Sequence, residues 1–291
     1  MMGPELAEPA IGSKNELAER TMEDIRVEDY SDITEGYLKN TRMKMAFILA
    51  MILSVFILSI VTIRLGASNL SYLEILRTLV YMDDPVKTWT VYEWRMPIIV
   101  SAILCGCILG IAGSVMQGVL RNPLASPSTL GISSAAAFGA GFGIMILGGG
   151  AMSAQMISDP YVVTASAFVF AMISVGVILL LIKFTDATPE TIILAGVAIG
   201  AIFSSAHGFL QYFADEATLA TIVFWQFGSL SKVSWSSIPM ITVSLVLAFV
   251  YFFYKRWDYN AMEAGDDMAS GLGVNIHRTR IVGLIVTSLI T

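Results

Sequence analysis

A stripe of polar side chains interrupts an apolar stretch in the second half of the chain. Ser204, His207 and Gln211 stand at positions i, i+3 and i+7, so on a helix they face a common direction. Hydroxyl, imidazole and amide groups in this arrangement either bond to a neighbouring helix or line a polar path through a helical bundle. Both interpretations stay open. Neither makes a metal site, because the only other histidine, His277, falls in a loop.

No catalytic or cofactor-binding pattern accompanies this stripe. Cys105 and Cys107 are two residues apart, so on a helix they point to different faces and predict neither a disulfide nor a metal site. Gly139, Gly141 and Gly143 have no preceding strand and no G-x-x-x-x-G-K-[ST] pattern, so they do not indicate a phosphate-binding loop. We therefore expect no enzyme activity, no bound cofactor or metal, and no nucleic-acid partner.

A polar loop over residues 258–280 is the second candidate site. Residues 263–270 favour a short helix, Gly271 and Gly273 suit a tight reversal, and a second helical turn follows. A compact helix–turn–helix between two apolar runs is typical of a docking element for a partner. A merely structured connector is the alternative.

The elements that position these residues must lie in lipid. Hydrophobic residues make up 56% of the 291 residues and charged residues only 14%, whereas soluble domains contain about 25% charged residues. The apolar residues also fall in blocks long enough to cross a bilayer. The composition therefore predicts an all-α, polytopic transmembrane bundle in the cell membrane.

Cutting the chain at its charged residues predicts six complete spans and the beginning of a seventh. The complete spans are expected at 45–63, 96–120, 128–147, 161–182, 191–213 and 237–254, and the seventh begins at 281–291. Ser126-Pro127, Asp159-Pro160 and Thr188-Pro189 each place a capping side chain before a proline, which predicts helix starts at the third, fourth and fifth spans.

Residues 217–230 are apolar but too short to cross the membrane. This segment contains Trp225 and ends near Gly228. It favours either an interfacial helix anchored by aromatic residues or a short helix that lines the mouth of a pore.

Charge sets the expected orientation and energy source. With the N-terminus inside, the inner loops carry eight Lys and Arg residues and the outer loops five, which favours a cytoplasmic N-terminus. None of the six spans contains Asp, Glu, Lys or Arg, and carriers coupled to protons or sodium generally need such groups at depth. Transport by this chain must therefore draw its energy from a partner.

The first 41 residues form an acidic tail. Residues 1–40 hold ten acidic and four basic side chains with few aromatics, which predicts a disordered or loosely helical cytoplasmic extension. Residues 42–291 then form the transmembrane domain.

Three stretches together resemble the FecCD-type permeases, which carry iron–siderophores, haem and cobalamin with a pair of ATPases. The first runs from Arg95-Met-Pro97 to Ala136 and includes the block Gln117, Gly118, Arg121, Asn122 and Pro123. The second begins at Leu194 and reaches Leu230, and the third covers residues 264–274.

The resemblance implies a type II ABC importer permease, in which a homodimer or a pair of permeases forms the pore. Two ATPase subunits would dock on the cytoplasmic loop, at Ala264, Gly265, Asp266, Asp267, Ala269, Leu272 and Gly273. An extracytoplasmic substrate-binding protein would dock at Arg95. The translocation pathway would be lined by Gly196, Gly200, Ser204, His207, Gln211, Trp225 and Gly228.

The resemblance also has two departures. The family often has a second basic residue after the proline of Arg-x-Pro, where this chain has Ile98. The family normally has ten spans, of which about seven are present, so we expect a transmembrane domain that is incomplete at its C-terminus. The expected cargo is an iron chelate such as a siderophore, or cobalamin or haem. A secondary carrier or channel not coupled to ATP is the alternative.

Overall fold

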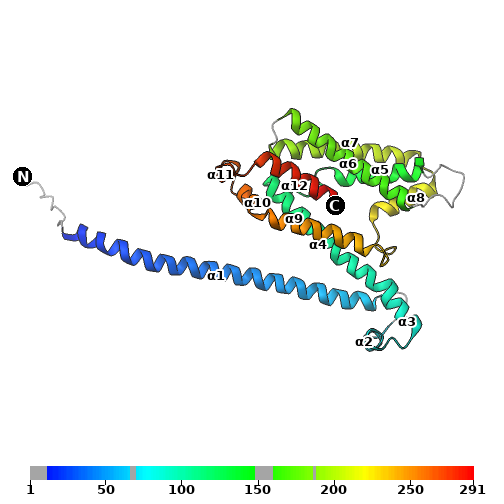
Figure 1. Cartoon of the computed structure of the whole chain (residues 1–291), viewed down its shortest axis with the longest axis horizontal. Helices are drawn as coiled ribbons and strands as arrows, with labels where there is room; N and C mark the ends of the chain where they lie inside the picture. The colour runs from blue at the N-terminus through cyan, green and yellow to red at the C-terminus, as the bar shows by residue number, and fades with distance from the viewer. Residues whose placement is uncertain (1–11, 66–69, 148–159, 186–187) are drawn as a thin grey trace, which may run out of the picture. The chain divides into compact units, whose positions relative to one another are not determined.

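The computed structural model describes residues 12–65, 70–147, 160–185 and 188–291, and these residues are all-helical apart from turns and short connections. The chain divides into two units, residues 1–75 and 76–291, which are described separately. Figure 1 labels the helices.

The first unit is dominated by α1, Gly12–Arg64, a single helix of 53 residues. Its apolar half exposes nearly every side chain, and Ser54, Ser59 and Thr62 donate their hydroxyl hydrogens to carbonyls four residues earlier at 2.8 Å. Such internal bonds satisfy hydroxyls that lipid cannot. Since the helix already begins at Gly12, residues 12–41 of the predicted disordered or loosely helical tail are helical. Residues 1–11 of the tail lie outside the described residues.

The helix α2, Tyr72–Tyr81, runs from the first unit into the second. The second unit continues with α3, Pro85–Trp89, the π-helical turn η1, Thr90–Arg95, and α4, Met96–Leu120, which form one continuous rod. The Asp84 carboxylate starts this rod by accepting the backbone N–H of Val86 and Lys87.

The next elements form the other side of the bundle. They are α5, Ile132–Phe142, the π-helical turn η2, Gly143–Leu147, α6, Pro160–Phe184, α7, Pro189–Phe213, and α8, Glu216–Phe227. The chain closes with α9, Ile238–Tyr254, α10, Arg256–Glu263, α11, Asp266–Gly271, and α12, Ile276–Ile290. In the second unit α5 packs between α6 and α7, while α4 packs against α9, α10 and α12 (Figure 1).

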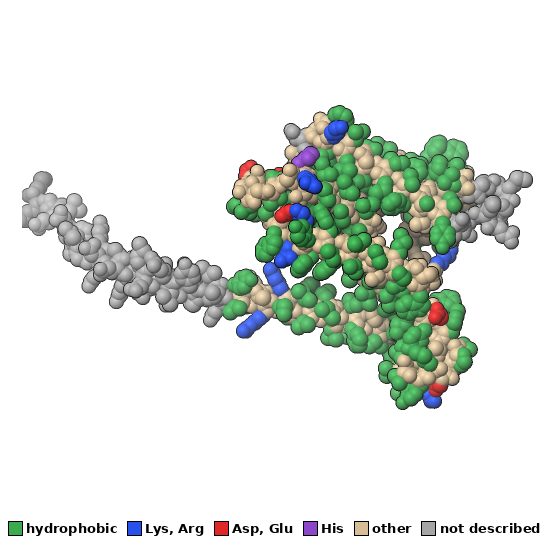
Figure 2. All heavy atoms as spheres, viewed as in Figure 1, with side chains coloured by type: hydrophobic (Ala, Val, Ile, Leu, Met, Phe, Trp, Pro, Cys, Tyr) green, Lys and Arg blue, Asp and Glu red, His purple; other side chains and the backbone are tan. Residues whose placement is uncertain are grey.

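By length and composition, four helices within the described residues could cross a membrane: 36–64, 85–120, 161–184 and 189–213. The pair α9 and α10, bent by 62°, would make a fifth. The remaining one of the six expected spans is the segment of α5 and η2, whose 16 residues are too few to be counted by length. In Figure 2 the sides of the bundle formed by the second unit are largely hydrophobic, as lipid contact requires.

The predicted third span is shortened at its start. Ser126 does not cap a helix, and its hydroxyl and carbonyl instead bond Thr129 within a turn. Gly131 has φ of +73°, a left-handed conformation that cannot continue a right-handed helix, so α5 begins only at Ile132. The prediction at Thr188 is confirmed, since its hydroxyl accepts the Thr191 N–H at the start of α7. Asp159 lies outside the described residues.

Glycine lets α5 approach its neighbours. The Ser166 hydroxyl of α6 donates to the Gly139 carbonyl at 2.6 Å. A Cβ at Gly139 would lie 2.6 Å from the Ser166 carbonyl oxygen and 2.9 Å from the Phe170 Cβ. The gap between α5 and α6 therefore has no room for even a methyl group.

We predict that Gly139→Ala lowers the stability of the bundle by about 1–3 kcal/mol, the usual cost of overpacking. Gly110→Ala in α4 is the matched control, because a Cβ there meets nothing within 4 Å and replaces a weak helix former with a strong one. Thermal unfolding in detergent micelles measures both. Equal midpoints for the two variants would contradict the close packing of α5 on α6.

Candidate functional site

The polar loop folds into the predicted helix–turn–helix. The first helix is α11, and the reversal follows at Gly273, whose φ of +81° favours glycine. Asn275 then caps α12 by accepting the Arg278 N–H at 3.0 Å. The predicted helix over residues 263–270 is shifted by three residues at its start, because Gly265, with φ of +125°, separates α10 from α11.

One carboxylate ties this loop to two membrane helices. Oδ1 of Asp266, at the start of α11, lies 3.0 Å from Nη2 of Arg121 and 3.0 Å from Nη2 of Arg280. The Arg280 Nη2 also donates to Asp266 Oδ2 at 3.2 Å, and its Nε donates to the Val119 carbonyl at 3.4 Å. We call Arg121, Asp266 and Arg280 the Asp266 clamp. It joins the end of α4, α11 and α12.

The backbone of the family-motif block positions Arg121. Arg121 itself adopts a left-handed conformation, with φ of 45°, as the C-terminal cap of α4. The turn that follows is held by side chains: the Gln117 amide donates to the Pro123 carbonyl at 3.1 Å, and Asn122 Oδ1 accepts the Leu124 N–H at 2.9 Å. These bonds hold the turn that directs the Arg121 guanidinium toward the loop.

Glycines again allow the close approach that the clamp needs. A Cβ at Gly118 of α4 would lie 3.2 Å from Oε1 of Glu263 at the end of α10. A Cβ at Gly283 of α12 would lie 2.9 Å from the Tyr259 hydroxyl oxygen. The spacing of α4, α10 and α12 therefore depends on small residues at these two crossings.

The clamp also determines how often the chain crosses the membrane between its members. Arg121 and Asp266 are in contact, so they lie at the same face, and an even number of crossings must separate them. The long helices α6 and α7 and the bent pair α9–α10 supply three. We predict that α5 with η2 is the fourth, since α8 is shorter still. At 16 residues this segment rises about 24 Å, short of a hydrocarbon core of about 30 Å.

The outer face of α11 is exposed and partly apolar. Ala269 is buried beneath the helix, while Met268 and Leu272, the residue that caps the helix end, are 58% and 68% exposed and form what we call its outer face. Asp267 and Ser270 are exposed beside them. In Figure 2 several charged side chains lie near α11 and the start of α12 in the view of Figure 1, and others lie near α2 and α3. The loop therefore presents a small apolar surface among charged groups.

The polar stripe of α7 faces the neighbouring helix α5. His207 is 6% exposed, its Nε2 lies 3.1 Å from the Gln211 amide nitrogen, and its Nδ1 would lie 3.3 Å from a Cβ at Gly141. The Ser204 hydroxyl donates to that of Ser134 in α5 at 3.1 Å. Ser204 thus bonds across to α5, whereas the hydrogen bond between His207 and Gln211 stays within α7, so both interpretations of the stripe stay open.

Gly196 and Gly200 lie at the closest contact between α7 and the turn before α5. A Cβ at Gly196 would lie 2.7 Å from the Leu130 Cα, and one at Gly131 would lie 2.6 Å from the Gly200 nitrogen. Both glycines are therefore packing positions in this structure.

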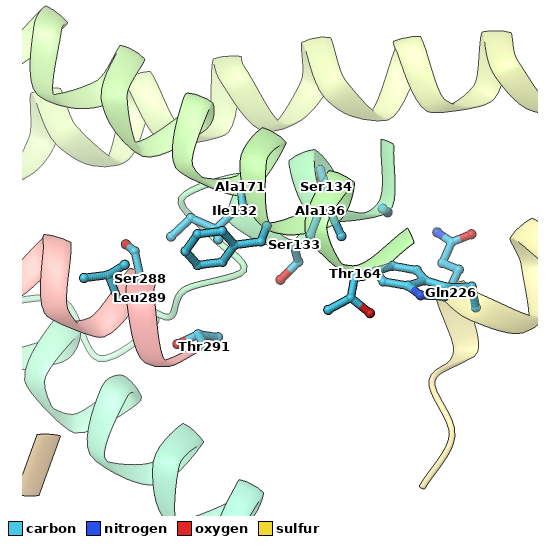
Figure 3. Close-up of a pocket in the computed structure, with 14 residues that line it drawn as sticks. Ile132, Ser133, Ser134, Ala136, Thr164, Ala171, Gln226, Ser288, Leu289 and Thr291 are labelled. Atoms are coloured by element: carbon cyan, nitrogen blue, oxygen red, sulfur yellow. The ribbon is translucent and has the colours of Figure 1, made fainter. Parts of the chain in front are cut away.

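A cavity of about 530 Å³ lies between α5, α6, α8 and the end of α12. Figure 3 shows Ser133, Thr164, Gln226 and Ser288 around it. Its lining carries hydroxyl, amide and aromatic groups and no charged side chain. Of the seven predicted pathway residues only Trp225 lines it.

The short helix α8 confirms the predicted segment before α9. Its Asp215 cap accepts the Thr218 N–H at 2.8 Å, and this bond, with a second from the Thr218 hydroxyl, holds the pKa of the Asp215 carboxyl below its ordinary value. Since the folded pKa is lowered, this cap contributes stability at neutral pH and loses it as the pH falls. The helix ends at Gly228, with φ of +72°.

Arg95 lies at the end of η1, where the rod enters α4, and it is only 7% exposed. A residue that docks another protein directly has to be accessible. A direct contact between Arg95 and a binding protein would therefore require this region to open.

Arg280 was missed by the sequence analysis as a site residue. It was counted only among the basic residues of the inner loops, and Arg278 two positions away has the same charge. The acidic Asp266 and the nearby arginines Arg278 and Arg280 suggest an ion pair, but the sequence does not indicate which arginine side chain faces the bundle. Among the described residues, no group of three or more His, Cys, Asp or Glu side chains could hold a metal ion.

The fold and this site define a multi-pass helical membrane protein. Residues 16–291 match the FecCD transport family, so the chain belongs to this family. The three stretches quoted from the sequence therefore identified the family correctly.

Three relatives illustrate its range. MJ0087 of Methanocaldococcus jannaschii, provisionally named an ABC transporter permease, is 43% identical over 264 residues, or 89% of this chain and 75% of the relative. The Fe(3+)-citrate import system permease YfmE of Bacillus subtilis is 33% identical, covering 83% and 69%. The hemin transport system permease HmuU of Yersinia pestis is 29% identical, covering 86% and 72%.

A solved structure agrees with this assignment. An ABC transporter provisionally assigned to the metal-chelate type, in an inward-facing conformation, superposes with a TM-score of 0.69 at 26% identity. The match covers 84% of this chain and 73% of that one.

We predict that Asp266→Asn lowers the stability of the protein by about 2 kcal/mol, because it removes one charged partner of the buried Arg280. The cost is less than for a fully buried pair, since the Asp266 side chain is 35% exposed. Asp267→Asn on the exposed face of α11 is the matched control and should change little. Chemical denaturation in micelles compares the two, and equal stabilities would mean that the clamp does not hold the loop.

Proposed function

We propose that this chain is the membrane-spanning permease subunit of an ATP-binding-cassette importer for a metal chelate. The observation that carries the proposal is the exposed apolar face of α11, presented by a helix that the Asp266 clamp fixes to the bundle. Apolar side chains such as Met268 and Leu272, exposed on a helix that is held in place, indicate a surface that a partner covers. Membership of the FecCD transport family supports the same conclusion.

The partner that fits this surface is an ATPase subunit on the cytoplasmic side. The Lys and Arg distribution favours a cytoplasmic N-terminus, and the six predicted spans, three in each direction, then bring α11 to the same side. The chain itself carries no nucleotide-binding pattern. We propose that two ATPase subunits supply the energy, one on each of two permease chains, whether these are identical copies or a pair.

An iron chelate is the proposed cargo. Two of the three relatives are named as permeases of hemin transport and of ferric citrate import. Cobalamin remains a further proposal from the family. The proposed path is lined by the polar side chains of α7 and by Trp225 of α8. At Gly196, Gly200 and Gly228, which have no side chain, the backbone itself would line it. Weakly selective groups of this kind leave the choice of cargo to an extracytoplasmic binding protein, for which Arg95 is the proposed contact once exposed.

We predict that Leu272→Arg and Met268→Arg each weaken binding of the cognate ATPase subunit, because a buried cation would replace the apolar contact. Affinity measured in nanodiscs should fall by about tenfold or more. His277→Arg, at the same end but on α12, adds the same charge outside this face and is the control. Unchanged affinity for both α11 variants would place the ATPase elsewhere.

We further predict that uptake of radiolabelled ferric citrate or hemin by the complete complex in proteoliposomes requires ATP. Imposed proton or sodium gradients should not replace it, because the six predicted spans hold no acidic or basic side chain to bind a coupling ion. Accumulation driven by either gradient without nucleotide would favour the secondary carrier instead.

A further inference from the structure

The Asp266 clamp joins three elements through one atom. Oδ1 of Asp266 accepts from Arg121 at the end of α4 and from Arg280 near the start of α12. The Arg280 side chain is 4% exposed, and its Nε reaches the Val119 carbonyl of α4. A displacement of α11 therefore pulls on two membrane helices at once, and α4 and α12 are also held to each other through Arg280.

The helix α11 needs such an attachment if it is to transmit a force. It has only six residues, too few to be stable as an isolated helix. Gly265 precedes it with φ of +125° and Gly273 follows it with φ of +81°, so the backbone at both ends can rotate easily. Without a side-chain link, a push on α11 would turn the helix about these glycines and leave α4 and α12 in place.

The bonds of the clamp suit this task. Charge-assisted bonds between guanidinium and carboxylate are shorter and about twice as strong as neutral hydrogen bonds. The clamp is shielded on the Arg280 side and open to solvent on the Asp266 side, so it anchors the loop from beneath while the outer face of α11 stays exposed. Docking and force transmission therefore use different side chains of the same short helix.

We propose that Arg121, Asp266 and Arg280 are positioning residues that transmit movement of the docked ATPase subunit from α11 to α4 and α12. This inference rests on the proposed function. It assigns a role to Arg280. It also gives binding and transmission to different residues: Met268 and Leu272 bind the partner, and the Asp266 clamp transmits the partner's movement to the bundle.

The test uses the complete complex in proteoliposomes, with its cognate ATPase subunit, its binding protein and radiolabelled ferric citrate or hemin. Three quantities are measured for each variant: affinity for the ATPase subunit, the rate of ATP hydrolysis, and cargo molecules transported per ATP. Arg280→Gln breaks the clamp. Arg278→Gln removes the same charge from an exposed position of α12 and is the matched control.

We expect Arg280→Gln to keep ATPase binding and hydrolysis close to the original values while transport per ATP falls about tenfold, within the usual range of coupling free energies. Arg278→Gln should leave all three unchanged. Arg121→Gln removes the guanidinium that joins α4 to Asp266, so transport per ATP should fall in this variant as well.

Two results would overturn the inference. Transport per ATP that is unchanged in Arg280→Gln would show that the clamp does not transmit force. Loss of ATPase binding in that variant, or failure to assemble, would show that the clamp only shapes the docking surface. Failure of the proposed function is recognised separately, since the unaltered complex would then transport without ATP or not bind the ATPase subunit at all.

Discussion

The carboxylate of Asp266 is the point at which three parts of the bundle meet. It accepts from Arg121 and Arg280 at 3.0 Å, and these guanidinium groups come from helices separated by more than 150 residues of chain. Other features of the second unit are consistent with this contact. An even number of predicted crossings lies between α4 and α11, and glycines stand where α10 and α12 approach α4.

The lipid environment explains why the Asp266 clamp lies at an end of its helices, outside their apolar middle. In the apolar helices of both units, polar groups find partners in the chain itself: Ser54, Ser59 and Thr62 of α1 bond to their own helix, and Ser204 of α7 bonds to Ser134 of α5. A cluster of two arginines and an aspartate could not be solvated among apolar side chains. It is stable at the end of α4 because Asp266 and Arg121 remain partly in water. That position is also where a soluble partner can reach the loop.

This arrangement separates the holding of a partner from the response to it. The exposed side chains of α11 face outward, and the clamp faces the bundle. Movement of an ATPase subunit would then act on α11, which is too short to be stable alone and is attached to the bundle by the ion pairs of Asp266. Polar contacts of α7 with α5 and the tight glycine packing there keep the other half of the unit together, so movement at α4 and α12 need not disturb it.

The sequence alone was enough to predict the lipid environment and the family. It also predicted the helix–turn–helix and most of the helices, because apolar runs, glycines and capping side chains act locally. It could not show that Gly131 adopts a left-handed conformation, so the third span was drawn too long and Ser126 was taken for a helix cap. It also could not distinguish Arg280 from Arg278, or decide that His207 faces α5. These features depend on which surfaces meet after folding. Only the tertiary structure brings Arg121, Asp266 and Arg280 within 3.0 Å, since pairing between distant segments leaves no periodic trace in the chain.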